Sequence, residues 1–197
     1  MNPLKSITGT IVSGVVLALI IAYAMSSGQG QPIEWTVWFH VIAGITWIGL
    51  LYYFNFVQVP AVGQALADKD PGPAAINKYV APLALLWFRW AALLTWLSGA
   101  AALGKLGIFG QAFSFENFSF AGSASVIGMG AWLGTIMLFN VWVLIWPNQK
   151  KILGMVEATP EEIASAKTVA LMASRTNTLL SIPMLLGMTA FAHGLPF

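Results

Sequence analysis

The chain has 197 residues, of which 58% are hydrophobic and 8% are charged, and its net charge is +2. A soluble domain carries about 25% charged residues, so the composition excludes an ordinary soluble protein and indicates an integral membrane protein. The sequence contains no cysteine, which excludes disulfides, thiolate metal sites, iron–sulfur clusters and covalently attached c-type haem. The small positive charge suits a membrane surface and gives no case for nucleic-acid binding.

Apolar runs predict an all-α fold, an integral membrane bundle of five transmembrane helices in a single domain covering residues 1–197. Each run is close to the roughly 20 residues that a bilayer requires. The expected spans are about 7–25, 34–57, 79–103, 123–146 and 168–192.

The first span also resembles a signal peptide, because Lys5 precedes it and Ala22-Tyr23-Ala24 lies near its end. The length of its apolar run favours a retained helix. Between the second and third spans, a short surface helix is expected around Val62 to Ala67.

The fourth and fifth spans carry further local signals. Glycines 128, 130 and 134 give the fourth span a small-residue face that suits close helix packing. The segment Thr159-Pro160-Glu161-Glu162 is a helix start signal with a capping threonine. We expect this last helix to run along the surface first, to enter the membrane near Thr168, and to kink at Pro183.

The positively charged loop residues predict the orientation, because cytoplasmic loops carry an excess of lysine and arginine. Only Lys105 falls on one side of the expected bundle. The other side therefore faces the cytoplasm with the N-terminus, and the C-terminus lies outside. The residues on that cytoplasmic side are Lys5, Lys69, Lys78, Lys150, Lys151 and Lys167.

The second span contains His40, one of only two histidines, well inside its apolar part. An ionisable side chain inside a span is costly and usually has a partner or a function. Gly44 lies one turn further on the same face, where a missing side chain lets a flat group or another helix approach the backbone. Trp47 and Leu51 continue this face, and Trp47 suits either core packing or contact with a porphyrin.

His193 ends the fifth span on the same expected outer side, so both histidines fall in one membrane leaflet. This placement predicts a haem b whose iron is held by His40 and His193. Thr36 and Thr189 each precede a histidine by four residues and could accept a hydrogen bond from the ring nitrogen that does not bind iron. Three alternatives remain open: a single-histidine site, ligation by methionine 184 or 188, and histidines that are simply polar residues near the interface.

A second group of polar residues is expected near the inner half or the midplane of the membrane. Apart from Glu34 at the very start of the second span, no acidic residue lies in an expected span, so buried arginines would need carbonyls, amides, or an outside group such as a quinone, a lipid phosphate or a haem propionate. The group forms either a structural hydrogen-bond cluster or a polar pocket for a quinol or small anion. It comprises Asn55, Arg89, Asn140, Arg175 and Asn177.

Four stretches carry a family resemblance: HVIAGITWIGLLYYFNFVQ, LLWFRWAALLTWLSG, FNVWVLIWPNQKKI and SRTNTLLSIPMLLGMTAFAH. In this order they resemble the urate oxidase (urate hydroxylase) N-terminal membrane-domain family. Its larger members are bacterial inner-membrane proteins in which a cytochrome c domain follows the membrane part. The resemblance implies a multi-pass protein of the inner (plasma) membrane, with redox work and electron transfer towards the periplasm. Residues that fall in the matching stretches are His40, Trp47, Arg89, Asn140, Arg175, Asn177 and His193.

Three functions compete at this point. The first is a b-haem electron-transfer subunit whose partner is a periplasmic cytochrome or quinol. The second is an oxidoreductase, a urate-type hydroxylase that needs a separate cytochrome c, because these residues contain no CxxCH motif. The third is a haem-free structural or assembly subunit of a larger membrane complex. The resemblance favours a haem-binding membrane module over any particular substrate.

Overall fold

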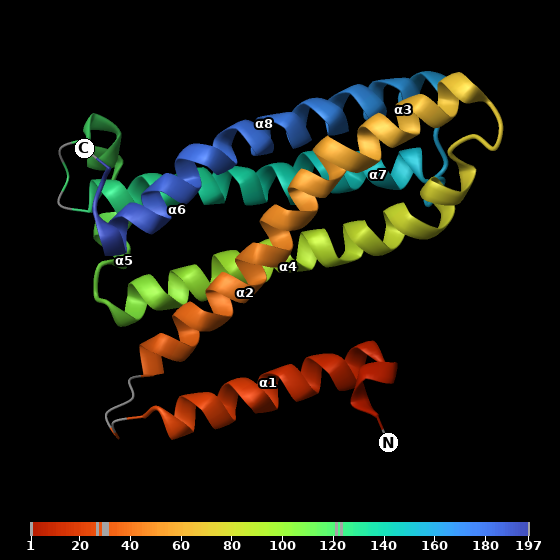
Figure 1. The fold of residues 1–197 in the computed structure, drawn as a ribbon. Helices are drawn as coiled ribbons and strands as arrows, with labels where there is room; N and C mark the ends of the chain where they lie inside the picture. Colours follow the sequence, from red (N-terminus) through yellow and green to blue (C-terminus); the bar gives the residue numbers. More distant parts are fainter. Residues whose placement is uncertain (1, 27, 29–31, 121, 123, 197) are drawn as a thin grey trace. The chain divides into compact units, whose positions relative to one another are not determined.

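The computed structural model describes residues 2–26, 28, 32–120, 122 and 124–196. These residues form helices and turns with no strand, which confirms the all-α fold class (Figure 1). The chain divides into two compact units, Met1–Trp35 and Thr36–Phe197, and the expectation of a single domain stays a prediction. Each unit is described by itself.

The first unit is built around α1 (Ile7–Ala24), which follows a short 3-10 turn at Pro3–Lys5. Ser6 caps α1, because its hydroxyl accepts a hydrogen bond from the Gly9 amide at 3.0 Å. Most apolar side chains of α1 are exposed, as expected of a helix surrounded by lipid.

Within the described residues, five helices are long and apolar enough to cross a membrane, which confirms the five expected spans. The expected start of the fourth span at Ser123 lies outside the described residues. The five helices are Ile7–Ala24, Pro32–Asp68, Ile76–Lys105, Ser125–Ile152 and Pro160–His193.

Three of these long helices contain a π-helical segment between or before their α-helical parts. The second comprises α2 (Pro32–Tyr53), η2 (Phe54–Gln58) and α3 (Val59–Asp68), so the expected surface helix continues the span instead of standing apart from it. The third comprises η3 (Ile76–Val80) and α4 (Ala81–Lys105). The fourth comprises α6 (Ser125–Phe139), η5 (Asn140–Ile145) and α7 (Trp146–Ile152).

The last long helix, α8 (Pro160–His193), has 34 residues. Its start signal is confirmed as a capping box: the Thr159 hydroxyl accepts from the Glu162 amide at 3.2 Å, and the Glu162 carboxylate accepts from the Thr159 amide at 2.9 Å. The helix continues through Pro183 to His193, and its C-cap residue is Gly194, whose φ is +82°. At about 1.5 Å per residue it is longer than a hydrocarbon core of about 30 Å.

Helices α6 and α8 approach each other through glycines. A Cβ on Gly187 would lie 2.7 Å from the Val126 carbonyl oxygen and 3.0 Å from the Gly130 nitrogen. The backbones are therefore in direct contact at this point. Of the three glycines expected on this face, Gly130 packs against α8 and Gly128 packs against the side chain of Asn117, but a Cβ on Gly134 would have no atom within 4 Å.

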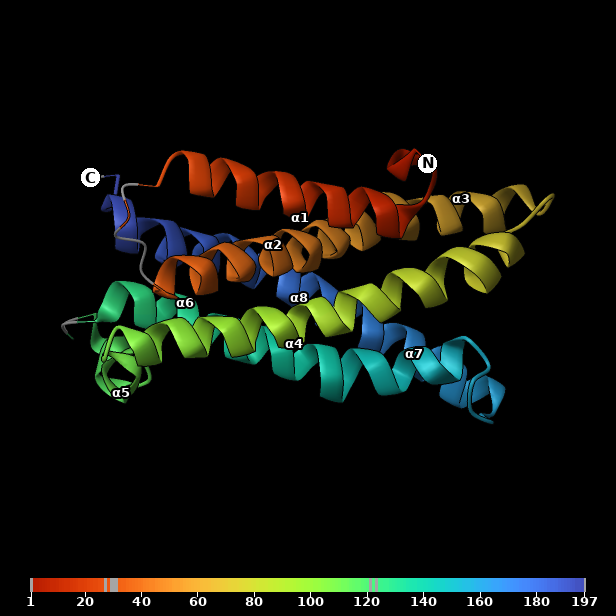
Figure 2. The same cartoon turned by 90° about the horizontal axis from the view of Figure 1, so that it is seen from below.

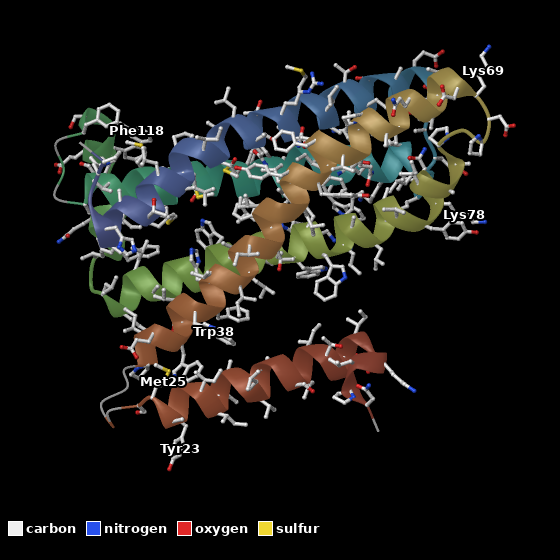
Figure 3. All side chains as sticks on the ribbon, in the orientation of Figure 1. Tyr23, Met25, Trp38, Lys69, Lys78 and Phe118 are labelled. Atoms are coloured by element: carbon white, nitrogen blue, oxygen red, sulfur yellow. The ribbon has the colours of Figure 1, made fainter. Side chains whose placement is uncertain are left out.

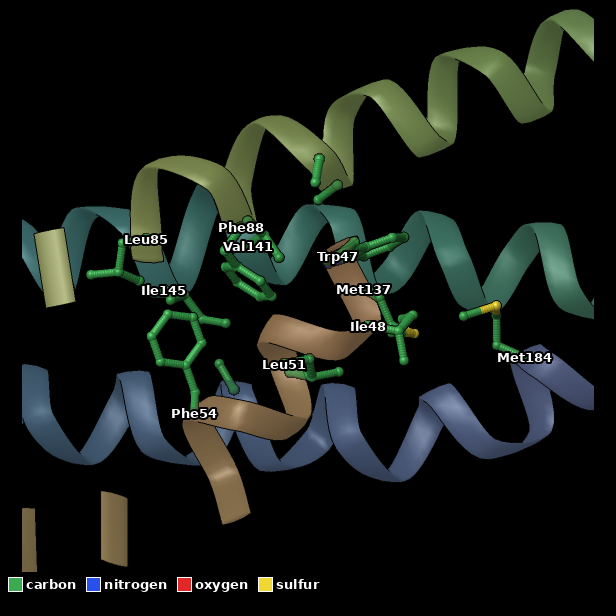
Figure 4. Packing of buried hydrophobic residues seen from close by; sticks show 13 residues of the cluster. Trp47, Ile48, Leu51, Phe54, Leu85, Phe88, Met137, Val141, Ile145 and Met184 are labelled. Atoms are coloured by element: carbon green, nitrogen blue, oxygen red, sulfur yellow. The ribbon is translucent and has the colours of Figure 1, made fainter. Parts of the chain in front are cut away.

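The hydrophobic core lies where α2 and α4 meet the α6–η5 helix and α8 (Figure 4). Trp47 and Leu51 of α2 are 2% and 0% exposed, and Phe88 of α4 is 1% exposed. Outward-facing apolar side chains such as Ile45 and Ile182 are each 67% exposed, which is the pattern of a bundle whose outer surface meets lipid.

The two ends of the second unit differ in charge and aromatic content. Lys69 and Lys78 lie at one end, and Phe118 lies at the other (Figure 3). Near Phe118, α5 (Phe109–Ala112) and the 3-10 turn η4 (Phe115–Ser119) gather aromatic rings around Trp132, with centroid separations of 5.2–5.6 Å. These rings suit the interfacial position expected for this loop.

Candidate functional site

His40 lies half-buried on α2 and faces α4. Its Nδ1 is 2.8 Å from the backbone carbonyl oxygen of Thr95. A carbonyl can only accept a hydrogen bond, so this contact places the ring proton on Nδ1 and leaves the lone pair of Nε2 available. The Ser98 hydroxyl lies 3.4 Å from the same nitrogen and donates to the Leu94 carbonyl at 2.6 Å.

Gly99 makes the close approach of the imidazole to α4 possible. A Cβ at Gly99 would lie 2.9 Å from His40 Cε1 and 3.1 Å from Nδ1, so any larger residue would displace the ring. Sequence reasoning missed Thr95, Ser98 and Gly99 as the surroundings of His40. Their spacing, three polar or small residues within two helical turns of an otherwise apolar span, is the signal that could have indicated them.

The acceptor expected for the His40 ring on its own helix is wrong. The ring bonds across to α4, and the Thr36 hydroxyl instead accepts a hydrogen bond from Lys105 Nζ at 2.6 Å. The reason is geometric. The imidazole leaves α2 on the side that packs against α4, so the ring lies closer to the α4 backbone than to the preceding turn of α2.

His193 is the last residue of α8 and is exposed. Figures 1 and 2 both show the end of α8 at the same end of the second unit as the part of α2 that follows Trp35. Both histidines thus belong to helix segments at one end of this unit. The Thr189 hydroxyl donates to its own helix, at 2.9 Å from the Leu185 carbonyl.

The rest of the α2 face that was expected to receive a flat group packs against protein. A Cβ at Gly44 would make an ordinary contact with the Thr95 methyl group at 3.6 Å. Trp47 is buried in the core cluster together with Ile48 and Leu51. At Gly44, the approaching partner is therefore helix α4.

The amide side chains of the expected polar group form two separate sets of hydrogen bonds. Asn140 Nδ2 donates to Asn177 Oδ1 at 2.8 Å, and Asn177 Nδ2 donates to the Met137 carbonyl at 3.0 Å. This pair is buried and joins the fourth long helix to α8. Asn55 instead donates to the Ser174 hydroxyl at 2.8 Å.

The two arginines do not join these amides. The Arg89 guanidinium lies over the Trp146 ring, with 3.6 Å between Cζ and the ring centroid. Arg175 is exposed on α8. The structure thus brings together Asn140 and Asn177 from the expected group and distributes the other three members elsewhere.

Among the described residues, no group of three or more His, Cys, Asp or Glu side chains could hold a metal ion. A haem iron needs only one or two protein ligands, because the porphyrin supplies the other four. The orientation of His40 is the feature that fits such a group: one ring nitrogen is fixed by a backbone acceptor, as metal-binding imidazoles usually are, and the other is available.

Fold and site together define an α-helical, multi-span membrane protein with a single oriented histidine between two of its helices. Residues 101–196 match the family model described as Urate oxidase N-terminal. This match confirms the family resemblance over the C-terminal half of the chain, which includes His193, Asn140 and Asn177. No curated protein and no solved structure matches the chain.

Proposed function

We propose that this chain is a membrane-bound b-type haem protein that acts in electron transfer, with His40 and His193 as the axial ligands. The observation that supports this proposal is the 2.8 Å contact between His40 Nδ1 and the Thr95 carbonyl, which presents Nε2 as a ligand. A bound haem b would supply reversible one-electron chemistry.

The chain's own residues would set the properties of that group. The Thr95 carbonyl fixes the tautomer and the ring plane of His40 and makes its Nε2 a stronger donor to a metal. The apolar surroundings on α2 and α4 provide a low dielectric, which tunes the reduction potential and limits access of water. His193, at the exposed end of α8, would complete the ligand pair.

The proposed location is the bacterial inner membrane, with the histidines in the periplasmic leaflet. The support is the charge distribution: Lys69 and Lys78 lie at the end of the unit opposite the aromatic turn that contains Phe118 (Figure 3). This orientation would suit exchange of electrons with a periplasmic cytochrome or with quinol. Urate-type hydroxylation with a separate cytochrome c is the alternative that the family match brings.

A reduced-minus-oxidised spectrum of the purified protein tests the proposal. We expect a b-type α band that is lost in His40→Ala and in His193→Ala. The matched variant is His40→Asn, whose side-chain NH2 can still donate to the Thr95 carbonyl but offers no nitrogen to iron. It should fold like the parent and lose the band.

A folded wild-type protein that lacks the band after growth with ample haem precursor would refute the haem assignment and favour the structural-subunit alternative. If the band is present, urate added under oxidising conditions separates the two redox functions. Urate loss coupled to haem reduction indicates a hydroxylase, and no reaction indicates an electron carrier.

A further inference from the structure

Two cations share the indole of Trp146. The Arg89 guanidinium lies 3.6 Å from the ring centroid and Lys150 Nζ lies 5.9 Å from it. Arg89 comes from α4, whereas Trp146 and Lys150 both belong to α7. Cations take this position because the face of an aromatic ring is electron-rich.

The indole does not neutralise these charges. In the described part of the chain, the ion pair that forms is Lys151–Glu162 at 3.3 Å, and neither Arg89 nor Lys150 has a carboxylate within 4.0 Å. A positive charge at the side of an apolar helix is costly without an anion or acceptor. The N–H groups at the edge of a stacked guanidinium remain able to donate to a planar or phosphate anion.

An apolar groove of about 390 Å³ lies between α4 and the fourth long helix. It is open on one side. One polar pair in its wall is already satisfied, because Trp96 Nε1 donates to the Thr135 hydroxyl at 2.8 Å. The apolar lining is Leu93, Trp96, Leu97, Leu138, Phe139 and Trp142.

The groove leads towards the two cations. On α4, Arg89 precedes Leu93 by four residues, so the two side chains lie on one face. On the fourth helix, Trp146 follows Trp142 by four residues, and the Trp142 ring contacts Trp90 of α4 at 5.4 Å between centroids. The apolar stripe thus continues along the helices to the stacked guanidinium.

This stripe is separate from the candidate haem site. His40 contacts Thr95, Ser98 and Gly99. At about 100° per residue, Thr95 and Ser98 lie on the side of α4 roughly opposite Leu93 and Arg89, and Gly99 lies about 80° around the helix from Arg89, away from Leu93. Occupation of the groove therefore leaves the imidazole contact untouched.

We propose that the groove binds one anionic phospholipid, with its phosphate at Arg89 and Lys150 and an acyl chain along the apolar lining. The groove provides an apolar track over about 12 Å, the distance spanned by eight helical residues. Lys69 and Lys78 lie at the same end of the unit as α7 (Figures 1 and 3), where an anionic leaflet would lie. Charge and shape together select this occupant over a neutral lipid.

Lipid binding to the full-length protein in detergent, followed by native mass spectrometry, tests the proposal. The probes are dioleoylphosphatidylglycerol and dioleoylphosphatidylcholine, which share their acyl chains and differ in charge. We expect the anionic lipid to bind with about fivefold preference per contributing cation, the ratio that corresponds to about 1 kcal/mol. Arg89→Gln should lower this preference about fivefold, because Lys150 remains, and Arg175→Gln, which removes the same charge from the exposed face of α8, should leave it unchanged.

Two further measurements distinguish binding of the acyl chain in the groove from binding of the headgroup alone. Leu97→Trp fills the groove and should weaken both lipids, whereas inorganic phosphate and glycerophosphoglycerol, which lack tails, should bind much more weakly than the lipid. Equal binding of the two lipids to the wild type, or tail-less headgroup binding as tight as the lipid, would overturn the proposal. If Arg89→Gln does not fold, Lys150→Gln in the last turn of α7 replaces it, with the same expected reduction of the preference, about fivefold.

Discussion

Gly187→Ala is the sharpest test of how the α6–α8 pair is held together. The added methyl group would lie 2.7 Å from the Val126 carbonyl oxygen, 3.0 Å from the Gly130 nitrogen and 3.2 Å from the Gly130 Cα. All three neighbours are backbone atoms, which cannot move by changing a rotamer. The helices must therefore separate locally or bend.

The size of the effect follows from the distances. Ordinary contact begins near 3.4 Å, so the shift needed at Val126 is the difference between 3.4 and 2.7 Å, about 0.7 Å. Overpacking of this kind costs about 1–3 kcal/mol, and a gap of that size also weakens the neighbouring contacts. The higher helix propensity of alanine offsets about 1 kcal/mol of this loss of stability. We expect a net loss of about 0–2 kcal/mol, which makes Gly187→Ala about 1–3 kcal/mol less stable than a glycine-to-alanine change that gains the same propensity without the contact.

Unfolding of the purified protein in detergent, monitored by circular dichroism, measures this loss. Gly134→Ala is the matched control, because its methyl group has no atom within 4 Å and should leave stability unchanged or raise it by up to about 1 kcal/mol. Equal stability of the two variants would refute the backbone-contact account of this helix pair.

Three further outcomes are expected from the same structure. Asn177→Leu removes the acceptor of Asn140 Nδ2 and should lower the free energy of unfolding by about 1–3 kcal/mol, with part of the loss recovered when both asparagines become leucine. Thr159→Ala removes the helix cap and should cost about 1 kcal/mol, measured by the same detergent unfolding. Gly99→Ala should displace the neighbouring imidazole and change the ¹⁵N shift of its Nδ1, whereas Gly104→Ala, with no atom within 4 Å, should leave that shift unchanged.

The number and order of the spans could be predicted from the sequence, because a run of about 20 apolar residues has few other uses. The helical residues that extend beyond the expected spans could not be predicted in this way. Residues 59–68 contain a proline and polar side chains that suggested a loop with a separate short helix, yet α3 continues from the π segment η2. Pro60 is the second residue of α3, directly after the π segment, so it is accommodated within the continuous helix and does not end it.

The candidate site, too, could be predicted from the sequence only in part. Composition singles out His40, because only two histidines occur and one of them lies inside a span. The partner of its ring could not be predicted, since the choice between the Thr36 turn and the Thr95 carbonyl depends on which helix packs against α2. Likewise, the similar membrane depth of five polar residues suggested one pocket. The side of the helix on which each residue lies could not be predicted, and on α8 Arg175 is exposed whereas Asn177 is buried.

The π-helical segment η5 (Asn140–Ile145) makes the fourth long helix tolerant of a one-residue deletion at this point. A π turn carries about one residue more than an α turn but covers the same full rotation, so loss of one codon within this segment would convert it to regular α-helix. Everything beyond it would then keep its rotational position relative to α6. Loss of one codon within α6 itself would instead rotate everything beyond it by about 100°, the angle between successive residues, and would turn Trp146 away from Arg89. Natural length variation at η5 would therefore change the length of this helix while related chains retain the same core and the same contact between Arg89 and Trp146.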